Sequence, residues 1–296
     1  MEWRSSHCNG SYCTCCRTSC NLGSLCSDTI RCMEHLAKRR RVMITELDIK
    51  AKSLLFAKLA SIAYGDTKEV KKAVKELGFT KVAYYDNGGA QAYRLESKTD
   101  VVVACRGTQP TEFNDIKADL KAIPVMAETI SRVHQGFKTE VDELWPLVCL
   151  GCGEDKIKTK SLWFCGHSLG AAMATIMAAR CMANPEVVDP VQLYTYGSPR
   201  VGWPAYVKSL KIDHIRWVNN NDIVTRVPFR IMGYRHHGIE KYINSMGDVT
   251  PPSLLSNRFS DRMKGMWMGL KKGSIDNFAD HSMVNYIEYL ERWNTK

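Results

Sequence analysis

Two kinds of hydrophobic pattern alternate along most of this chain. Short continuous apolar runs, which are typical of buried strands, lie at residues 101–105 and 162–165, and further strand-like stretches lie at 191–196 and 215–218. Between them, apolar residues recur every three or four positions, which is typical of helices. The last such segment, 281–293, carries Val284, Ile287 and Leu290 on one face. Strands that alternate with helices predict an α/β domain with a mostly parallel, doubly wound sheet flanked by helices.

A hairpin is expected near the start of this domain. Residues 81–85 and 91–95 alternate between apolar and polar positions, and Asp86-Asn87-Gly88-Gly89 lies between them. Asn-Gly and Gly-Gly pairs favour the positive backbone φ angles that tight hairpin turns require. We therefore predict two antiparallel strands joined by a short turn.

The first 41 residues differ in composition from the rest of the chain. They hold seven of the twelve cysteines, show little periodicity and end in the basic run Lys38–Arg41. We predict a disordered, cysteine-rich basic tail over residues 1–41 and a single α/β domain over residues 42–296.

Three interpretations of the tail cysteines remain open. They could bind zinc, although their spacing is irregular. Cys13, Cys15 and Cys16 could be S-acylated beside basic residues and anchor the tail to a membrane. The tail could also have no defined role. The basic run fits either a solvated linker or a nuclear-targeting signal.

Charge and hydropathy limit the possible partners and locations. Lys and Arg exceed Asp and Glu by ten (41 against 31), and the tail supplies four of these charges. The other charges are thinly spread and no nucleic-acid-binding motif accompanies them, so we expect no nucleic-acid partner. No apolar run approaches the roughly 20 residues that span a bilayer, and the N-terminus has no apolar signal region. We therefore predict an intracellular protein, cytoplasmic or peripheral to a membrane.

One short stretch carries the pattern of a nucleophile. Gly166-His167-Ser168-Leu169-Gly170 fits G-x-S-x-G, after an apolar strand and before a helix rich in alanine and methionine. In this context the serine lies on a sharp strained turn, and the small residues around it let strand and helix pass closely. Ser168 is therefore the candidate nucleophile, with the positive end of a helix dipole beneath it.

A serine hydroxyl needs a base, and the base needs an orienting carboxylate. Functional residues of doubly wound sheets follow the carboxyl ends of strands. Asp222 follows the strand at 215–218 and is the candidate acid, and His281 at the start of the last helix is the candidate base. The order Ser, Asp, His is that of α/β-hydrolase-type sheets. The rival carboxylates are Asp213, Asp248, Asp276 and Asp280.

An oxyanion formed at Ser168 would need two donors. The backbone N–H of Leu169, the residue after the nucleophile, is the first. The second is expected from the loop after the strand at 101–105, where Thr108 offers both an N–H and a hydroxyl.

Seven segments, in this order, resemble the class 3 lipases, the fungal triacylglycerol lipase family of the α/β-hydrolase fold. They are Cys105–Thr108, Asp119-Leu120, Val133–Phe137, Gly166–Ala171, Thr195–Gly202, Asn219–Val224 with Pro228, and Asp280-His281. The resemblance implies that Ser168, Asp222 and His281 form the triad. It also implies that Thr108 and Leu169 form the oxyanion hole, and that no cofactor or metal takes part.

The resemblance implies hydrolysis of acyl glycerols, or of phospholipids, through an acyl-enzyme at a membrane or lipid-droplet surface. The alternative is an inactive hydrolase fold that serves as a membrane-binding module. The stretch 263–272, apolar with flanking lysines, fits either a membrane-interface segment near the acyl-binding mouth or a loop packed on the core.

The segment 109–120 is interpreted as a lid over Ser168. Phe113, Ile116 and Leu120 can share one apolar face at helical spacing. The resembling family often has an Asp-Trp pair there, whereas this chain has Asp115-Ile116 and less aromatic surface. Each apolar side chain contributes roughly 1.5–3 kcal/mol on burial, so we expect only a moderate rise in activity at a lipid interface.

Replacing Phe113 and Ile116 with serine should test this lid. We expect lost activity on aggregated lipid, retained activity on a soluble short-chain ester and an unchanged melting temperature, because a lid contacts lipid only when open. An equal loss on both substrates, with a lower melting temperature, would show that the segment belongs to the core.

Overall fold

The computed structural model describes residues 43–107, 122–250 and 279–296. Several expectations fall on other residues: the tail at 1–41, Thr108, the segment 263–272 and the lid with Phe113, Ile116 and Leu120. The following elements belong to the described part of the chain.

The main sheet has eight strands in the order β1-β2-β3-β6-β7-β8-β9-β10. They are β1 Lys81–Asn87, β2 Ala90–Glu96, β3 Asp100–Cys105, β6 Ser161–His167, β7 Pro190–Tyr196, β8 Asp213–Asn219, β9 Ile239–Ile243 and β10 Val249–Thr250. The strands from β3 to β9 run parallel, whereas β1, β2 and β10 pair antiparallel with their neighbours. A separate pair joins β4 Pro124–Met126 to β5 Arg132–His134.

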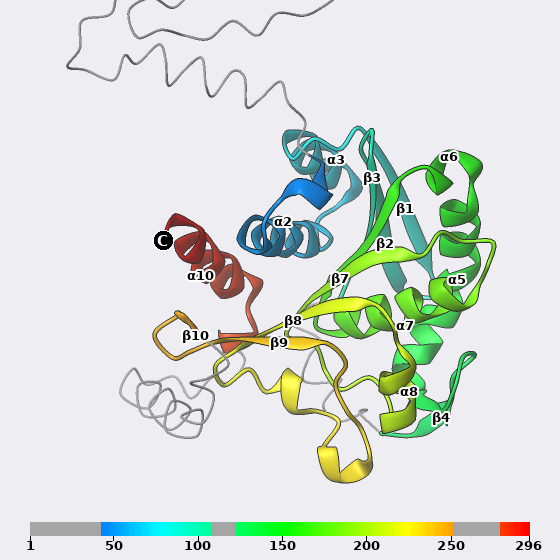
Figure 1. Cartoon of the computed structure of the whole chain (residues 1–296), viewed down its shortest axis with the longest axis vertical. Coiled ribbons are helices and arrows are strands. Elements are labelled where there is room, and N and C mark those ends of the chain that lie inside the picture. Colours follow the sequence, from blue (N-terminus) through cyan, green and yellow to red (C-terminus); the bar gives the residue numbers. More distant parts are fainter. Residues whose placement is uncertain (1–42, 108–121, 251–278) are drawn as a thin grey trace, which may run out of the picture. The chain divides into compact units, whose positions relative to one another are not determined.

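Helices cover both faces of this sheet (Figure 1). The α-helices are α2 Ile49–Ile62, α3 Thr67–Glu76, α5 Gln135–Gly153, α6 Asp155–Lys158, α7 Leu169–Ala183, α8 Pro204–Ser209 and α10 Met283–Thr295. Four 3-10 turns are η1 Ile44–Glu46, η3 Val224–Arg226, η4 Arg230–Met232 and η6 Ala279–His281. Helices α2 and α10 pack together on one face, and α5 and α7 pack together on the other. None of the described helices is long and apolar enough to cross a membrane.

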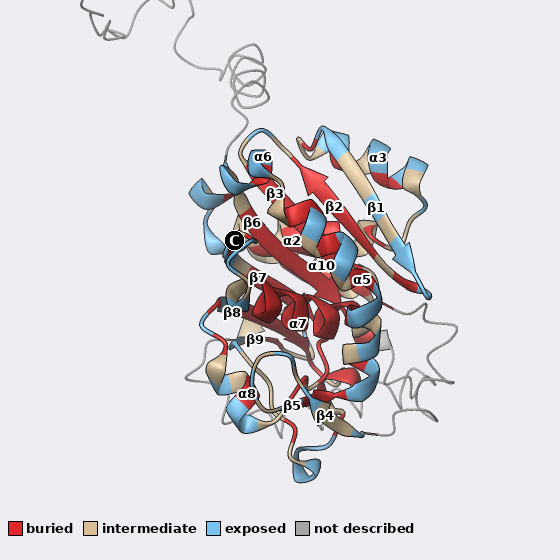
Figure 2. Cartoon of the chain, turned by 90° about the vertical axis from the view of Figure 1, so that its right-hand side faces the viewer, coloured by how far each residue is buried: buried red, intermediate tan, exposed pale blue. Residues whose placement is uncertain are grey.

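Alternate residues of the central strands enter two different cores. In β6, Leu162 and Phe164 pack with α5 and α7, whereas Trp163 and Cys165 pack with α2 and α10. A strand buried on both faces is mostly apolar, which explains the continuous apolar runs at 101–105 and 162–165. Figure 2 shows the result: β6, β7 and α7 are coloured as buried, whereas β1 at the edge is largely not. The predicted α/β-hydrolase-type sheet is confirmed.

The last helix turns a different face to the core from the one expected. Val284 was expected on the buried face with Ile287 and Leu290, but it is 71% exposed. The residues of α10 that are buried are Met283, Tyr286 and Leu290. The helix turns this way because the ring of Tyr286 is fully buried in the core and its hydroxyl has polar partners there.

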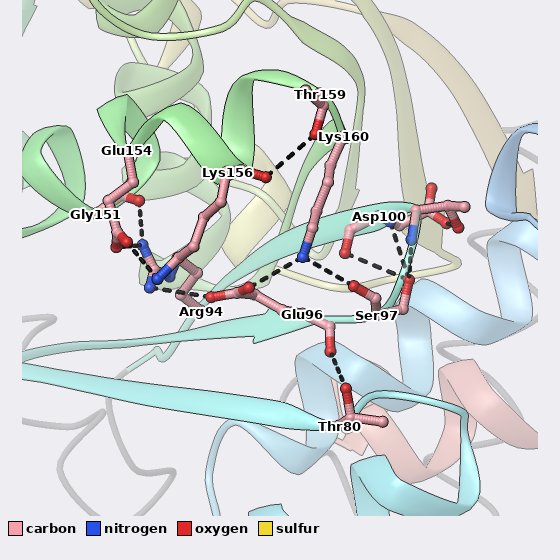
Figure 3. A network of polar contacts seen from close by, with 11 residues as sticks. Thr80, Arg94, Glu96, Ser97, Asp100, Gly151, Glu154, Lys156, Thr159 and Lys160 are labelled. Atoms are coloured by element: carbon pink, nitrogen blue, oxygen red, sulfur yellow. Dashed lines mark hydrogen bonds and ion pairs between the residues drawn. The ribbon is translucent and has the colours of Figure 1, made fainter.

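A network of charged groups joins β2 to α5 and α6 (Figure 3). Arg94 donates to Glu154 Oε1 at 2.8 Å and to the carbonyl of Gly151, and it forms an ion pair with Glu96 Oε1 at 3.0 Å. Lys160 Nζ lies 3.1 Å from the other oxygen of Glu96. Since the side chains of Arg94 and Glu96 are only 8% and 3% exposed, their charges depend on these partners rather than on water.

We therefore predict that Arg94→Ala lowers the free energy of unfolding by about 3–5 kcal/mol, because it removes one partner of a buried carboxylate. The control is Lys156→Ala, which breaks an exposed ion pair with Glu154 and should cost at most about 1 kcal/mol. Urea unfolding followed by circular dichroism measures both. Equal small losses would mean that the buried network adds no more than a surface pair.

Candidate active site

Ser168 lies on the sharp turn between β6 and α7. Its backbone has φ +59° and ψ −129°, a conformation that residues with a side chain rarely adopt. Its N–H donates to the carbonyl of Tyr196 in β7 at 3.1 Å, which ties the turn to the neighbouring strand. The Ser168 side chain is buried, and its Oγ has no hydrogen-bond partner among the described residues. The local geometry matches the strained serine turn that the sequence predicted.

Glycines make this turn possible. A Cβ on Gly166 would collide with the backbone of Gly170, and a Cβ on Gly170 would collide with the carbonyl of Cys105 in β3. Helix α7 therefore begins in direct backbone contact with the sheet. This contact leaves no room for a longer connection between strand and helix.

The structure brings Asp222 and His281 together across 59 residues of sequence. Asp222 lies in the turn after β8, and His281 ends the 3-10 turn η6 before α10. His281 Nδ1 lies 2.9 Å from each carboxylate oxygen of Asp222. Since a carboxylate only accepts, Nδ1 carries the proton and Nε2 is left with the lone pair of a base.

The other candidate carboxylates have different partners. Asp280, the sequence neighbour of His281, accepts from Asn220 Nδ2 at 3.2 Å and from the N–H of Asn221 at 3.1 Å. It therefore holds the turn that carries Asp222 instead of orienting the histidine. Asp248 pairs with Lys296 at the surface, Asp213 is exposed at the start of β8, and Asp276 lies outside the described residues.

Tyr286 braces Asp222 from α10. Its hydroxyl donates to Asp222 Oδ2 at 2.8 Å and accepts from the N–H of Asn219 at 2.9 Å. Val224 donates its N–H to the other carboxylate oxygen at 3.0 Å. Burial, with the charge of Asp222 beside it, raises the pKa of Tyr286 well above its usual value, so the hydroxyl keeps its proton. The carboxylate therefore has one orientation toward His281.

A second brace joins the serine turn to the histidine. His167 Nε2 lies 2.7 Å from the backbone carbonyl of His281, and Tyr64 Oη lies 2.9 Å from His167 Nδ1. A carbonyl only accepts, so Nε2 carries the proton and Nδ1 accepts from Tyr64. Burial, and then the nearby His281, hold the pKa of His167 well below its usual range, so the ring stays neutral. His167 thus fixes the main chain of His281 from the residue next to Ser168.

The loop after β3 reaches the same place. A Cβ on Gly107 would lie 2.7 Å from the carbonyl of His167 and 3.3 Å from Ser168 Cβ. Leu169 opens α7, where a backbone N–H has no carbonyl of its own helix to bond. Thr108 lies outside the described residues, so the position of its donors stays a prediction.

Three residues of this region were not identified from the sequence: Tyr64, Tyr286 and Gly197. Each contacts the site from a distant segment, and no local pattern marks such a contact. Gly197 has φ +57°, and a Cβ there would lie 2.7 Å from both Asp222 Oδ2 and His281 Nδ1. The run Gly197-Ser198-Pro199 after a strand was the one available signal, because a glycine at that point allows a close approach.

Comparison with known proteins shows which proteins this chain is similar to. Residues 102–232 match the family model described as Lipase (class 3). A lipase of Rhizomucor miehei is 33% identical over 175 residues, which are 56% of this chain and 47% of that protein. The secreted mono- and diacylglycerol lipase A of Penicillium cyclopium is 39% identical over 87 residues, 29% of this chain and 28% of that protein.

The solved structure of Rhizomucor miehei triacylglyceride lipase superimposes with a TM-score of 0.58 at 24% identity, over 67% of this chain and 81% of that chain. The chain spans less than half the length of each of the two curated relatives above, the Rhizomucor lipase and the Penicillium lipase. The sheet, the serine turn and this structural likeness define an α/β-hydrolase fold. Within that fold, residues 102–232 match the class 3 lipase family, so the resemblance noted in the sequence is confirmed over this part of the chain.

The contact of Gly197 with the acid and the base gives a sharp test. Gly197→Ala should lower ester hydrolysis by about a hundredfold, because a methyl group there must displace Asp222 or His281 by an ångström or so. The measurement is kcat/KM on a soluble ester together with the melting temperature.

The matched control is Gly78→Ala. Gly78 also has a positive φ, +93°, but nothing lies within 4 Å of its ideal Cβ. This change should cost about 1–2 kcal/mol of stability and leave kcat/KM unchanged. If the two variants kept similar activity, the close approach at Gly197 would have no bearing on catalysis.

Proposed function

We propose that this protein is a serine carboxylic ester hydrolase that cleaves acyl glycerols through an acyl-enzyme. The contact between His281 Nδ1 and both oxygens of Asp222, beside the strained turn at Ser168, is the observation that carries the proposal. The family and the names of the relatives, lipase and mono- and diacylglycerol lipase, support the substrate class.

In this mechanism Ser168 Oγ attacks the ester carbonyl carbon while His281 Nε2 takes its proton. The tetrahedral intermediate collapses, and the leaving glycerol oxygen takes the proton back from His281. A water molecule, deprotonated by the same nitrogen, then attacks the acyl-enzyme and releases the fatty acid. Asp222 stays ionised throughout and stabilises the imidazolium that forms in each half-reaction.

The oxyanion of each intermediate would be held by Leu169 and Thr108. The N–H of Leu169 lies at the N-terminus of α7, where the helix dipole also favours negative charge. Gly107 lies next to Ser168, which supports the proposal that Thr108 donates to the same oxyanion. Losing one such donor typically costs roughly 3–4 kcal/mol of transition-state stabilisation.

An inactive hydrolase fold that only binds membranes is the competing proposal. Its weakness is the buried Asp222 carboxylate, which has four directed contacts and no evident use in membrane binding. Acyl glycerols gather at membrane and lipid-droplet surfaces, so peripheral attachment belongs to the enzymatic proposal. The intracellular location stays a prediction from the sequence, since the Penicillium relative is named as secreted.

Labelling with a fluorophosphonate probe separates the two proposals, because only an activated serine reacts. We expect the protein to be labelled and to hydrolyse a soluble ester, and Ser168→Ala to abolish both with an unchanged melting temperature. His281→Ala should be nearly as damaging, and Asp222→Asn somewhat less so, with losses of at least about a thousandfold for the first two. More than a few per cent of activity in Ser168→Ala would mean that the nucleophile is misassigned.

The pH profile tests the base independently. An imidazolium cannot accept the Ser168 proton, so a histidine base predicts that activity falls as the pH decreases. His167, whose pKa is held well below its usual range, stays neutral over the same interval and adds no ionisation of its own. A rate on a neutral ester that stayed flat from pH 8 down to pH 5 would argue against a histidine base.

A further inference from the structure

A strongly basic cavity of about 390 Å³ lies apart from the serine turn. It is lined by Arg200, Arg216, Arg226, Arg230, Arg235 and Glu240, among others. These residues come from the loop after β7, from β8, from the segment 226–235 that contains η3 and η4, and from β9. They are largely in the yellow part of the chain in Figure 1. The lining therefore belongs to four separate segments that the sheet brings together.

The lining carries far more positive than negative charge. Among the described residues that line the cavity, five guanidinium groups and one carboxylate give an excess of four positive charges. Arg216 Nη2 lies 2.7 Å from Glu240 Oε2, and the two residues are direct partners across β8 and β9. Within the described residues, Arg226 and Arg235 form no ion pair. Like charges gathered in one concave site raise the local concentration of anions.

Hydrogen bonds to neutral groups hold several of these arginines in place. Arg200 Nη1 donates to the carbonyl of Pro228 at 3.0 Å and to that of Arg226. Arg226 Nη2 donates to Asn221 Oδ1 at 2.8 Å, and Arg235 Nη1 donates to two backbone carbonyls at 2.8 Å. Neutral acceptors fix a guanidinium group without cancelling its charge, so Arg226 and Arg235 are ordered and remain positive.

We propose that this cavity binds a small ligand that carries several phosphate groups. Guanidinium groups match the oxygens of phosphate in paired hydrogen bonds, and four excess charges call for a polyvalent anion. The volume lies in the range of small-molecule sites, whereas the charged lining is unsuited to an acyl chain. The ligand is either free in solution or the head group of a phosphorylated membrane lipid.

The site adjoins the candidate active site through one turn. Arg226 holds Asn221, Thr225 Oγ1 donates to the carbonyl of Asp222 at 2.8 Å, and His236 Nε2 lies 2.8 Å from the carbonyl of Thr225. Substitutions at Arg226 would therefore disturb the turn that carries Asp222. Arg230 and Arg235 are the better test positions, because Arg230 is exposed and the side-chain Nη1 of Arg235 donates to carbonyls within residues 230–235.

The experiment uses the full chain with Ser168→Ala, which prevents lipid hydrolysis and makes binding independent of the proposed activity. Inositol hexakisphosphate is the soluble probe, and isothermal titration calorimetry and the melting temperature are the readouts. We expect saturable binding that weakens with added salt, and at least about a tenfold weaker affinity in Arg230→Gln/Arg235→Gln. Arg230→Gln alone, at an exposed position, should give a smaller loss in the same direction.

The control is Lys71→Gln/Lys72→Gln, which removes two charges from the exposed side of α3 and should change the affinity less than twofold. An equal loss of affinity in both double variants would show that the probe responds only to the overall charge of the protein, and this would overturn the proposed site. The absence of any binding would also overturn it. Citrate that bound as tightly as the phosphate probe would overturn the assignment to phosphate.

Vesicles distinguish the two sources of the phosphate. Phosphatidylcholine vesicles with phosphatidylinositol bisphosphate are compared with phosphatidylserine vesicles of equal surface charge. Co-sedimentation that prefers the bisphosphate and is lost in Arg230→Gln/Arg235→Gln assigns the site to a lipid head group. Equal, variant-independent sedimentation on both vesicles, with the soluble probe still bound, assigns it to a free phosphate compound.

Discussion

The site depends on one backbone contact, the approach of the start of α7 to β3 and β6. Gly170 lies against the carbonyl of Cys105, and Gly166 lies against Gly170, with no space for a side chain at either position. The chain must therefore reverse within a single residue, which forces Ser168 to a positive φ. The packing of a largely buried, alanine-rich helix against the sheet holds this strained residue in place, and the sheet in turn aligns the ends of β6, β7 and β8.

The acid and the base are held from the opposite face of the sheet. Tyr286 and Asp280 both bind the turn after β8, and the second of them directly precedes His281. Since α10 packs on α2, the helix that fixes the base also closes the second hydrophobic core. The same contacts thus stabilise the fold and position the candidate base. A change that loosened the packing of α10 would also move the imidazole of His281.

Much of this arrangement could be predicted from local sequence. Continuous apolar runs marked the buried strands, and G-x-S-x-G between a strand and a helix marked the turn of Ser168. Chain order selected Asp222 and His281, which the structure brings into contact. The contributions of Tyr64 and Tyr286 could not be predicted, because they depend on which distant segments the sheet places side by side.

The placement of His281 has a consequence for synthesis of the protein. Among the described elements, η6 and α10 are the last to be made, whereas the serine turn is complete more than a hundred residues earlier. On the ribosome, a chain that had already formed β6 and α7 would hold its strained serine without a base. Such a nascent chain would lack the proposed esterase activity, which would first arise when α10 docks.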